Sequence, residues 1–424
     1  MYCPSAHENA SGAMGKERHS LKVLVLSHLY PHASDPRLGV FVEEEVKALS
    51  DLCQLKVIAP IPWAPPLWQT RRWGAHAPPR RHEIRQGIEV FRPPMIVLPK
   101  RVLFSLLGFS YFASVFARTR ALDSSFGFDL IHAHTAYPDG FAAALLGKLL
   151  RRPVVVTLHG SDITVNLERY LWRRLSLWGL SNVAHVIAVS QALRKTVVDK
   201  YGADGDRVTV IPNGVDVTRF VPVPAAEARK ALGMDDQGPI VLYVGAIKRS
   251  KGVGYLLRSA GRLVETHKPC PRFFFLGEGE YEREARQLSD ELGLADIVVF
   301  AGNKPNREIP VWMNACDVLV LPSLSEGFGV VLIEAMACGK PVVSTRCGGP
   351  EEIVMPGTGI LVPPHDEVAL AEALDDVLTG KRALDPRTIR QHATANYSYD
   401  HIASRIMGVY TQTLQGGERV SHPS

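Results

Sequence analysis

The stretch Ser325–Val343, SEGFGVVLIEAMACGKPVV, says more about the fold than any other part of the sequence. It reads as a glycine-rich turn, a short apolar helix and the start of a buried strand, which is typical of an α/β protein with a parallel sheet. The turn, Gly327-Phe328-Gly329-Val330, exposes backbone N–H groups at the positive end of the helix dipole. A helix start of this kind favours the binding of a phosphate group.

Two acids flank this turn, Glu326 before it and Glu334 inside the helix. A carboxylate fixed on the helix can accept hydrogen bonds from two neighbouring hydroxyls, such as those of a ribose. Glu326 precedes the turn, where a sugar attached to a bound phosphate would reach. An isolated pair of acids at this spacing is usually an ordinary solvated loop, but the flanking glycines and the strand that follows favour a binding site.

Strand-like apolar runs alternate with helical stretches along the whole chain, which predicts two consecutive doubly wound domains. A length of 424 residues also favours two domains. The predicted strands are 21–27, 54–61, 129–133, 153–158, 185–189 and 208–211 in the first half, and 240–244, 272–276, 297–301, 318–322 and 341–345 in the second. The predicted helices include 40–49, 140–150, 253–266, 281–292, 307–315 and 330–338.

The composition is that of a globular protein with a large core, since 46% of the residues are apolar and 21% are charged. None of the six cysteines forms a C-x-x-C pair, which argues against a zinc site and a disulfide scaffold. Residues 1–20 lack the apolar core of a signal peptide. We therefore expect a cytoplasmic protein.

The formal net charge is +5, and the excess of positive charge lies in the first half of the chain. A basic half can attract an anionic partner or membrane surface, and it can equally favour solubility alone. The apolar stretch Val102–Ala117 is too short to span a bilayer and has basic residues on both sides. This pattern is typical of a buried helix or of one that lies at the inner face of a membrane, and the sequence leaves both alternatives open.

The segment from Ser325 to Val343 resembles the nucleotide-sugar site of retaining glycosyltransferases of family 4, which have the GT-B fold. The similarity extends from about Leu21 to about Leu414 and is more specific in the C-terminal half. The resemblance implies two Rossmann-like domains that face each other across a cleft. It also implies transfer of a sugar from a nucleotide diphosphate to an acceptor hydroxyl, with retention of the anomeric configuration.

Turn formers and prolines interrupt the periodic pattern in NGVDVTRFVPVP, Asn213 to Pro224, so the domain boundary is predicted there. We expect a disordered lead-in over 1–20, an N-terminal acceptor-side domain over 21–213, a linker over 214–224 and a C-terminal nucleotide-sugar-binding domain over 225–398. The resemblance adds a helix over 399–414 that joins the N-terminal domain. The Trp- and Pro-rich stretch 60–79 is expected to be a loop that shapes an acceptor site.

Lys251 matches the lysine of the family pattern G-R-L-x-x-x-K-G, which begins here at Gly245. In the family, the arginine and the lysine neutralise the departing diphosphate. Ala246 stands in the place of the arginine. We expect that Lys248 or Arg249 replaces it, or that Lys251 and the helix dipole suffice.

The resemblance thus predicts a complete donor site in the C-terminal domain. Glu326 and Lys251 are expected to be catalytic, with Glu326 on the sugar hydroxyls and Lys251 on the phosphates. Gly277 follows a strand and would let the nucleotide approach the backbone closely. The donor-binding residues are expected to be Gly245, Lys251, Gly277, Glu326, Gly327, Phe328, Gly329, Val330 and Glu334, together with Gly39 of the N-terminal domain.

Four positions of the N-terminal domain match the family. Gly39 corresponds to a glycine close to the sugar-phosphate, although a simple helix-start role is the alternative. His134, the second histidine of I-H-A-H, corresponds to a residue near the hydroxyls of the donor sugar, and we predict it to be catalytic. His159 and Asp162, from H-G-S-D, are expected to contact the acceptor or the sugar.

We predict no metal or other cofactor. The D-x-D sequence at Asp204-Gly205-Asp206 has the composition of a turn. His132 and His134 share one face of a strand and could ligate a metal, but the sequence shows no third ligand.

The sequence therefore predicts a hexosyltransferase of class EC 2.4 in bacterial cell-surface polysaccharide or glycolipid synthesis. Its partners would be a nucleotide-sugar donor and a saccharide or lipid-linked acceptor, with an anionic membrane surface as a further candidate and no nucleic acid. Two alternatives stay open. One is a sugar-nucleotide epimerase or hydrolase of the same fold, and the other is a non-catalytic nucleotide-sugar-binding protein, which the missing arginine would suit.

Overall fold

The computed structural model describes residues 21–63, 81–97, 106–164, 170–234 and 238–420. The predicted lead-in over 1–20 and most of the 60–79 loop lie outside the described residues. The chain forms two compact units. The first contains the described residues up to Val189, Leu193–Ile211 and the chain from Ile402 onward, and the second contains Ser190–Ala192 and Pro212–His401.

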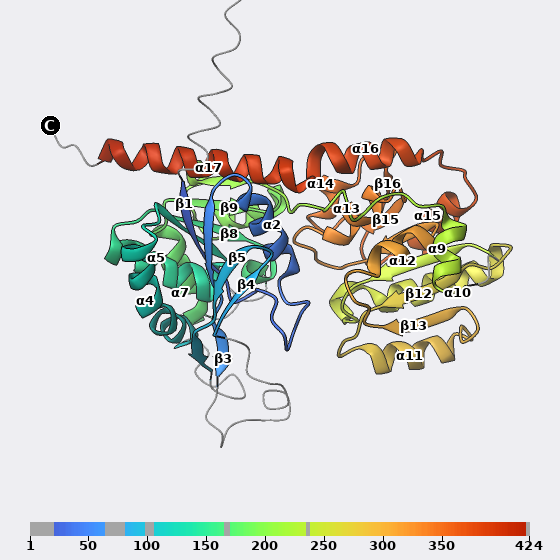
Figure 1. The fold of residues 1–424 in the computed structure, drawn as a ribbon. Coiled ribbons are helices and arrows are strands. Elements are labelled where there is room, and N and C mark those ends of the chain that lie inside the picture. The colour runs from blue at the N-terminus through green and yellow to red at the C-terminus, as the bar shows by residue number, and fades with distance from the viewer. Residues whose placement is uncertain (1–20, 64–80, 98–105, 165–169, 235–237, 421–424) are drawn as a thin grey trace, which may run out of the picture. The chain divides into compact units, whose positions relative to one another are not determined.

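The first unit is built on an eight-stranded sheet with the order β10-β9-β8-β7-β1-β2-β5-β4 (Figure 1). Its strands are β1 (Lys22–Leu26), β2 (Gln54–Ile58), β4 (His82–Arg85), β5 (Ile88–Phe91), β7 (Leu130–His134), β8 (Val154–Leu158), β9 (His185–Ala188) and β10 (Val208–Val210). All neighbours are parallel except the edge pair β4 and β5. Two further strands, β3 (Ile61–Trp63) and β6 (Pro94–Ile96), form a separate parallel pair.

Helices cover both faces of this sheet. On one face, α2 (Val40–Ser50) and the first-unit part of α17 (Tyr399–Val420) bury apolar side chains against β1, β2 and β7. On the other face lie α4 (Leu107–Ser125), α5 (Phe141–Leu150) and α7 (Tyr170–Ser181), which Figure 1 shows side by side. The shorter elements are η4 (Ala136–Gly140), α6 (Ser161–Thr164), α8 (Gln191–Lys195), η6 (Thr196–Lys200) and η7 (Gly205–Arg207).

The second unit has a six-stranded, all-parallel sheet with the order β13-β12-β11-β14-β15-β16. Its strands are β11 (Ile240–Val244), β12 (Arg272–Leu276), β13 (Val298–Gly302), β14 (Val318–Leu321), β15 (Val342–Thr345) and β16 (Gly359–Val362). The helical elements are α9 (Ala225–Ala231), η8 (Arg249–Lys251), α10 (Val253–Thr266), α11 (Glu282–Glu291), α12 (Ile309–Ala315), α13 (Val330–Ala337), α14 (Pro350–Ile353), α15 (Glu367–Leu378) and α16 (Pro386–Tyr397). This strand order is that of a Rossmann sheet, whose ligands bind at the switch point between the first and fourth strands, here β11 and β14.

Most predicted strands are present with ends shifted by a single residue, and the α/β class with two Rossmann-like sheets is confirmed. The strand predicted over 54–61 is wrong, because β2 ends at Ile58 and β3 begins only at Ile61. Pro60 has no N–H to donate to a ladder, which explains the interruption. The prediction of a loop over 60–79 missed β3, and the short strands β4, β5, β6 and β16 were also missed.

The D-x-D sequence forms a turn, as predicted. Gly205–Arg207 is a single 3₁₀ turn, and the Asp204 carboxylate accepts a hydrogen bond from the backbone N–H of Asp206. An aspartate engaged in this way caps the turn.

Gly252 fixes how closely the loop after β11 approaches the end of β14. Its φ of 71° is left-handed, and a Cβ added there would lie 1.8 Å from the carbonyl oxygen of Pro322. Any other residue would be strained and would push the two strand ends apart. The two loops therefore depend on this glycine for their separation.

We expect Gly252→Ala to lower the free energy of unfolding by about 2 kcal/mol or more, because it combines a left-handed φ with a backbone clash. Gly261→Ala is the matched control, since Gly261 lies inside α10 with nothing within 4 Å of its added Cβ. That change should stabilise the protein by about 0.5–1 kcal/mol. Urea unfolding curves measure both effects, and equal stability of the two variants would contradict the close approach at Gly252.

Candidate active site

Lys251 and Glu326 meet at the switch point of the second sheet. The Lys251 ammonium lies 2.7 Å from Oε2 of Glu326, and the Ser323 hydroxyl donates to the same oxygen at 3.2 Å. Both side chains remain partly accessible, with 27% of Lys251 and 15% of Glu326 exposed. The pair is therefore placed where a ligand could compete for the ammonium group.

Backbone hydrogen bonds hold the two loops of this pair in place. The Leu324 N–H donates to the Ser250 carbonyl at 2.8 Å, which ties the loop after β14 to the loop after β11. The Gly349 N–H donates to the Glu326 carbonyl at 3.0 Å. Gly349 also passes so close to Phe328 that an added Cβ would lie 2.4 Å from its Cα. The position of Glu326 is thus set by the backbone on both sides.

The glycine turn opens α13 as the sequence predicted. Gly329 adopts a left-handed φ of 103° as the N-cap residue, and no side chain caps the helix. The first N–H groups of α13 therefore have no side-chain acceptor, and they lie in the same loop as Glu326. Free amides at a helix start suit an anionic ligand.

Glu334 projects from α13 in a desolvated position. Burial raises the pKa of its carboxyl group to about 7, although the nearby positive charge of Arg219 opposes this change. Glu334 is consequently close to half-protonated at neutral pH. Because only the ionised carboxylate accepts hydrogen bonds at both oxygens, the hydrogen bonding of Glu334 should change with pH around neutrality.

The glycines of the neighbouring loops allow close backbone packing. A Cβ on Gly277 would lie 1.9 Å from the Gly245 carbonyl oxygen, and the Gly245 N–H donates to the Leu276 carbonyl. Ala246 is exposed in this loop. The Arg249 guanidinium lies over the Tyr281 ring at 4.5 Å, whereas Lys248 is exposed. Either side chain is therefore a candidate for the role of the missing arginine.

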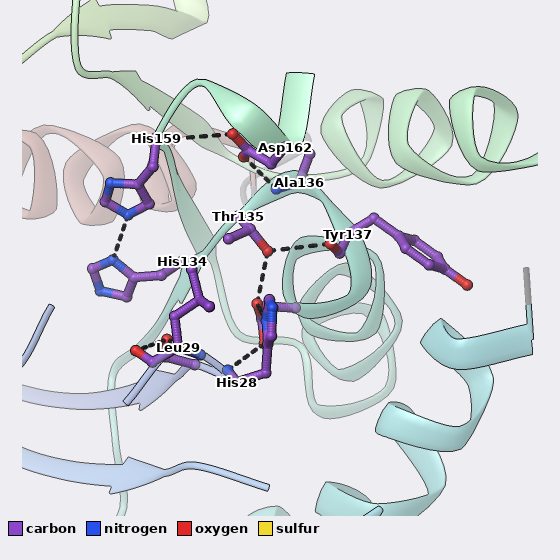
Figure 2. A network of polar contacts seen from close by, with 10 residues as sticks. His28, Leu29, His134, Thr135, Ala136, Tyr137, His159 and Asp162 are labelled. Carbon is purple, nitrogen blue, oxygen red and sulfur yellow. Dashed lines mark hydrogen bonds and ion pairs between the residues drawn. The ribbon is translucent and has the colours of Figure 1, made fainter. Parts of the chain in front are cut away.

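His134 is completely buried in the first unit, at the end of β7. Its Nδ1 lies 3.2 Å from Nε2 of His159, and its Nε2 lies 3.8 Å from Oε1 of Glu45 on α2 (Figure 2 shows the two histidines). Burial, reinforced by the neighbouring His132 and His159, holds the pKa of His134 well below its ordinary value. His134 is thus neutral, and it reaches the rim of the sheet through His159.

Glu45 supplies the third possible metal ligand that the sequence did not reveal. Potential ligand atoms of Glu45, His132 and His134 lie within 4.8 Å of one another. Both ring nitrogens of His132 are already engaged, with the hydroxyls of Thr157 at 2.8 Å and Tyr410 at 2.7 Å. A metal ion would have to displace one of them. Glu45 Oε1 and His134 Nε2 are buried and form no hydrogen bond within the described part of the chain. Burial raises the pKa of Glu45 to about 8, which keeps it protonated at neutral pH.

His159 and Asp162 have different surroundings. The His159 ring is partly exposed and packs on Phe41 of α2 at 4.7 Å. Asp162 is buried, and its oxygens accept hydrogen bonds from the backbone N–H groups of Ala136, His159 and Gly160. Asp162 therefore joins the loops that follow β7 and β8 (Figure 2).

Gly39 is the N-cap residue of α2, with a left-handed φ of 64°. An added Cβ would lie 2.2 Å from the Leu29 carbonyl oxygen, so the helix start packs directly on the loop after β1. This close approach explains the need for glycine without reference to a ligand.

His28 and Asp139 form a contact that the sequence analysis missed. His28 Nδ1 lies 2.5 Å from Asp139 Oδ2. His28 follows β1, and Asp139 lies in η4, which follows β7; β1 and β7 are the two strands at the switch point of the first sheet. Both residues lie close to the ends of predicted strands, and this position is the sequence feature that could have marked them as candidates for the site. Their pairing could not be read from the sequence because 111 positions separate them.

No helix in the described part of the chain is both long enough and apolar enough to cross a bilayer. Residues 102–105 of the predicted stretch Val102–Ala117 lie outside the described residues, and Leu107–Ala117 forms the first part of α4, which continues to Ser125. One face of α4 is buried through Gly108, Tyr111 and Val115, while Phe109 is exposed.

Two family models match the chain. Residues 38–219 match Glycosyltransferase Family 4, and residues 225–398 match Glycosyl transferases group 1. A "Putative teichuronic acid biosynthesis glycosyltransferase" of Bacillus subtilis (strain 168) is 30% identical over 361 residues, which cover 84% of this chain and 88% of that protein. A D-inositol 3-phosphate glycosyltransferase of Stackebrandtia nassauensis is 33% identical, over 68% of this chain and 69% of that protein.

Solved structures share the fold. Sucrose-phosphate synthase from Thermosynechococcus elongatus superposes with a TM-score of 0.74 at 24% identity, covering 93% of this chain and all of that one. The Anabaena protein HepE in complex with UDP-glucose superposes with a TM-score of 0.70 at 23% identity, covering 92% of this chain and all of that one. The chain therefore belongs to glycosyltransferase family 4, has the GT-B fold, and is a glycosyltransferase of class EC 2.4.

Proposed function

We propose that the enzyme transfers a sugar from a nucleotide-diphosphate donor to an acceptor hydroxyl and retains the anomeric configuration. The contact between Lys251 and Glu326 at the switch point of the second sheet carries this proposal. It brings together a cation for the phosphates and a carboxylate for the sugar hydroxyls, beside a helix start that no side chain caps.

The barrier of such a transfer depends on the leaving group. Negative charge grows on the β-phosphate while the anomeric carbon becomes oxocarbenium-like, so groups that bind the growing charge accelerate the step. In this proposal Lys251 and the amides of Gly327–Val330 bind that charge, and no metal is needed. In the donor complex the diphosphate would take over the Lys251 ammonium, which frees Glu326 for the sugar. The departing phosphate oxygen would take the proton of the acceptor hydroxyl.

Similar proteins support the choice of donor and pathway. HepE has been solved with UDP and with UDP-glucose, which favours a nucleotide sugar here. The relatives named for teichuronic acid biosynthesis and for D-inositol 3-phosphate favour a role in bacterial cell-surface polysaccharide or glycolipid synthesis. Nucleotide release that requires an acceptor would distinguish this transferase from a hydrolase, and tight binding without release would indicate a non-catalytic protein.

Membrane association is the second part of the proposal. Five exposed apolar residues, here called the aromatic face, lie on α7 and at the start of α4, the two helices that pack on α5: Leu106, Phe109, Tyr170, Leu171 and Trp178. Phe109 and Trp178 both contact the Phe141 ring, at 5.0 and 5.5 Å. Basic residues accompany the aromatic face. Arg173 and Arg174 are exposed on α7, and the Lys148 ammonium lies 5.2 Å from the centre of the Trp178 ring. Apolar and cationic groups on one face suit the surface of an anionic bilayer.

Lys251→Ala and Glu326→Ala should each lower turnover by about 10²-fold or more. The first change removes a group that binds the growing phosphate charge in the transition state, and the second removes a group that binds the sugar. Nucleotide release from the preferred donor measures the effect. Lys230→Ala and Glu227→Ala on the exposed face of α9 are matched controls and should keep wild-type rates. Near-wild-type turnover of both site variants in folded protein would remove the proposed site.

Donor affinity should depend on pH through Glu334. Because the pKa of this carboxyl group is raised to about 7, the ionised form that accepts two ribose hydroxyls is lost as pH falls below 7. We expect nucleotide affinity to rise by up to about tenfold between pH 6 and 8 in the wild type. Glu334→Gln should lose this part of the pH dependence, and identical pH profiles of the two proteins would exclude the role.

The aromatic face should bind vesicles that contain phosphatidylglycerol and should not bind vesicles of phosphatidylcholine alone, since the basic residues need an anionic surface. Flotation measures the bound fraction, which should fall with added salt. The Phe109→Ser, Leu171→Ser double variant should lose binding, whereas Val368→Ser, an exposed apolar residue of the second unit, should keep it. Unchanged binding of the double variant would contradict this assignment.

A further inference from the structure

The pair His28–Asp139 in the first unit has a buried acid and a partly exposed base. The Asp139 carboxylate is fully buried, whereas 29% of the His28 side chain is exposed. His28 directly follows the turn after β1, where the Ser27 hydroxyl donates to the Leu29 carbonyl and accepts from the Leu29 N–H. The imidazole is therefore fixed at the rim of the sheet by its neighbours on both sides.

Three donors surround the carboxyl group of Asp139. Its oxygens receive hydrogen bonds from the His28 backbone N–H at 2.9 Å, from the Thr135 hydroxyl at 2.7 Å and from His28 Nδ1 at 2.5 Å. The oxygens of Asp139 are the acceptors in all three contacts. Nδ1 of His28 must then carry a proton, and Nε2 becomes the ring nitrogen that faces away from Asp139. Among the described residues, none forms a hydrogen bond with Nε2.

The charge of the imidazole follows from its surroundings. Burial disfavours the imidazolium, but the Asp139 carboxylate and, more weakly, that of Asp162 on α6 outweigh it and raise the pKa of His28 above 6.5. Tyr111 of α4 also lies beside Asp139, and burial raises the pKa of its hydroxyl, so it adds no charge. His134, which lies on the neighbouring strand β7, is neutral. These surroundings favour the imidazolium form of His28 more than water does.

A second His–Asp pair in the same chain shows what a purely structural contact looks like. His267 Nδ1 lies 2.8 Å from Asp375 Oδ1, but there the histidine is buried, with 5% exposed, and the acid is the more exposed partner, with 23%. Lys381 already neutralises Asp375 at 2.6 Å. That pair turns its imidazole inward, while the His28 pair presents its imidazole to ligands.

We propose that His28, oriented by Asp139, donates from Nε2 to a phosphate-type or carboxylate anion on the acceptor. This deepens the proposed function, on which it rests, because it names an anionic acceptor. The donor diphosphate offers the same anionic chemistry, and the separate KM values for donor and acceptor distinguish the two sources. Asp139 is then a positioning residue, and His28 is the residue that contacts the substrate.

The test uses histidine-labelled full-length protein and inorganic phosphate as the probe. The NMR signal of His28 is identified by its loss in His28→Gln and is followed from pH 5 to 9 with phosphate or chloride at equal ionic strength. An anion that binds the protonated ring must raise its pKa, so phosphate should move the His28 midpoint upward by about 0.5 pH or more. The His267 signal is the internal control and should not respond to phosphate.

Asp139→Asn separates positioning from simple surface charge. We expect the His28 midpoint to fall below its wild-type value and the response to phosphate to disappear, because the ring loses both its partner charge and its fixed direction. A His28 midpoint at or below 6.5 in the wild type, or a midpoint that phosphate does not change, would overturn the proposal. None of these readouts needs turnover, so failure here is distinct from failure of the proposed transferase reaction.

Kinetics provide the second readout once an acceptor supports turnover. His28→Gln should raise KM for an anionic acceptor by about tenfold while leaving the donor KM unchanged. The same variant should not affect an uncharged analogue of that acceptor. A change in donor KM alone would contradict the assignment of His28 to the acceptor.

Discussion

The ion pair of Lys251 and Glu326 joins two loops that lie 75 positions apart in the sequence, and the proposed chemistry depends on this contact. The strand order of the second sheet makes it possible, because β11 and β14 are neighbours and both loops leave their carboxyl ends. Gly252 and Gly349 bring the backbones close enough for the side chains to meet. A Rossmann-like sheet thus turns two distant motifs into one site.

The sequence predicted this half of the molecule well for a physical reason. Buried parallel strands are continuous apolar runs, and each helix after them begins at a glycine or a polar turn. The hydrophobic pattern and the turn residues therefore indicate the same element boundaries. In the first unit, β4, β5 and β6 were missed because each has only three or four residues, too few to show a pattern, although β5 is mostly buried. Lys251 and Glu326 were predicted to share one site because each lies within a local motif, and their side chains are in contact.

The first unit was harder to interpret because its polar groups act through contacts between distant elements. One buried cluster contains Glu45 of α2, His132 of β7 and Tyr410 of α17. No local sequence motif predicts that these residues meet. Burial keeps Glu45 protonated and His132 neutral, with pKa values of about 8 and about 3. His28 is the contrast, since its contact with Asp139 raises the pKa of the imidazole despite burial. Whether a histidine can bind an anion therefore depends on the groups around its ring, which the sequence alone does not give.

The central claim is that Lys251 and the amides before α13 hold a diphosphate without a divalent metal. Calorimetric titration with the diphosphate and the monophosphate of one nucleoside, both in the presence of EDTA, tests it most directly. The account predicts that the wild type prefers the diphosphate by about tenfold or more and that Lys251→Ala loses this preference. Equal affinity for the two nucleotides in the wild type, or a preference that appears only with Mg²⁺, would contradict it.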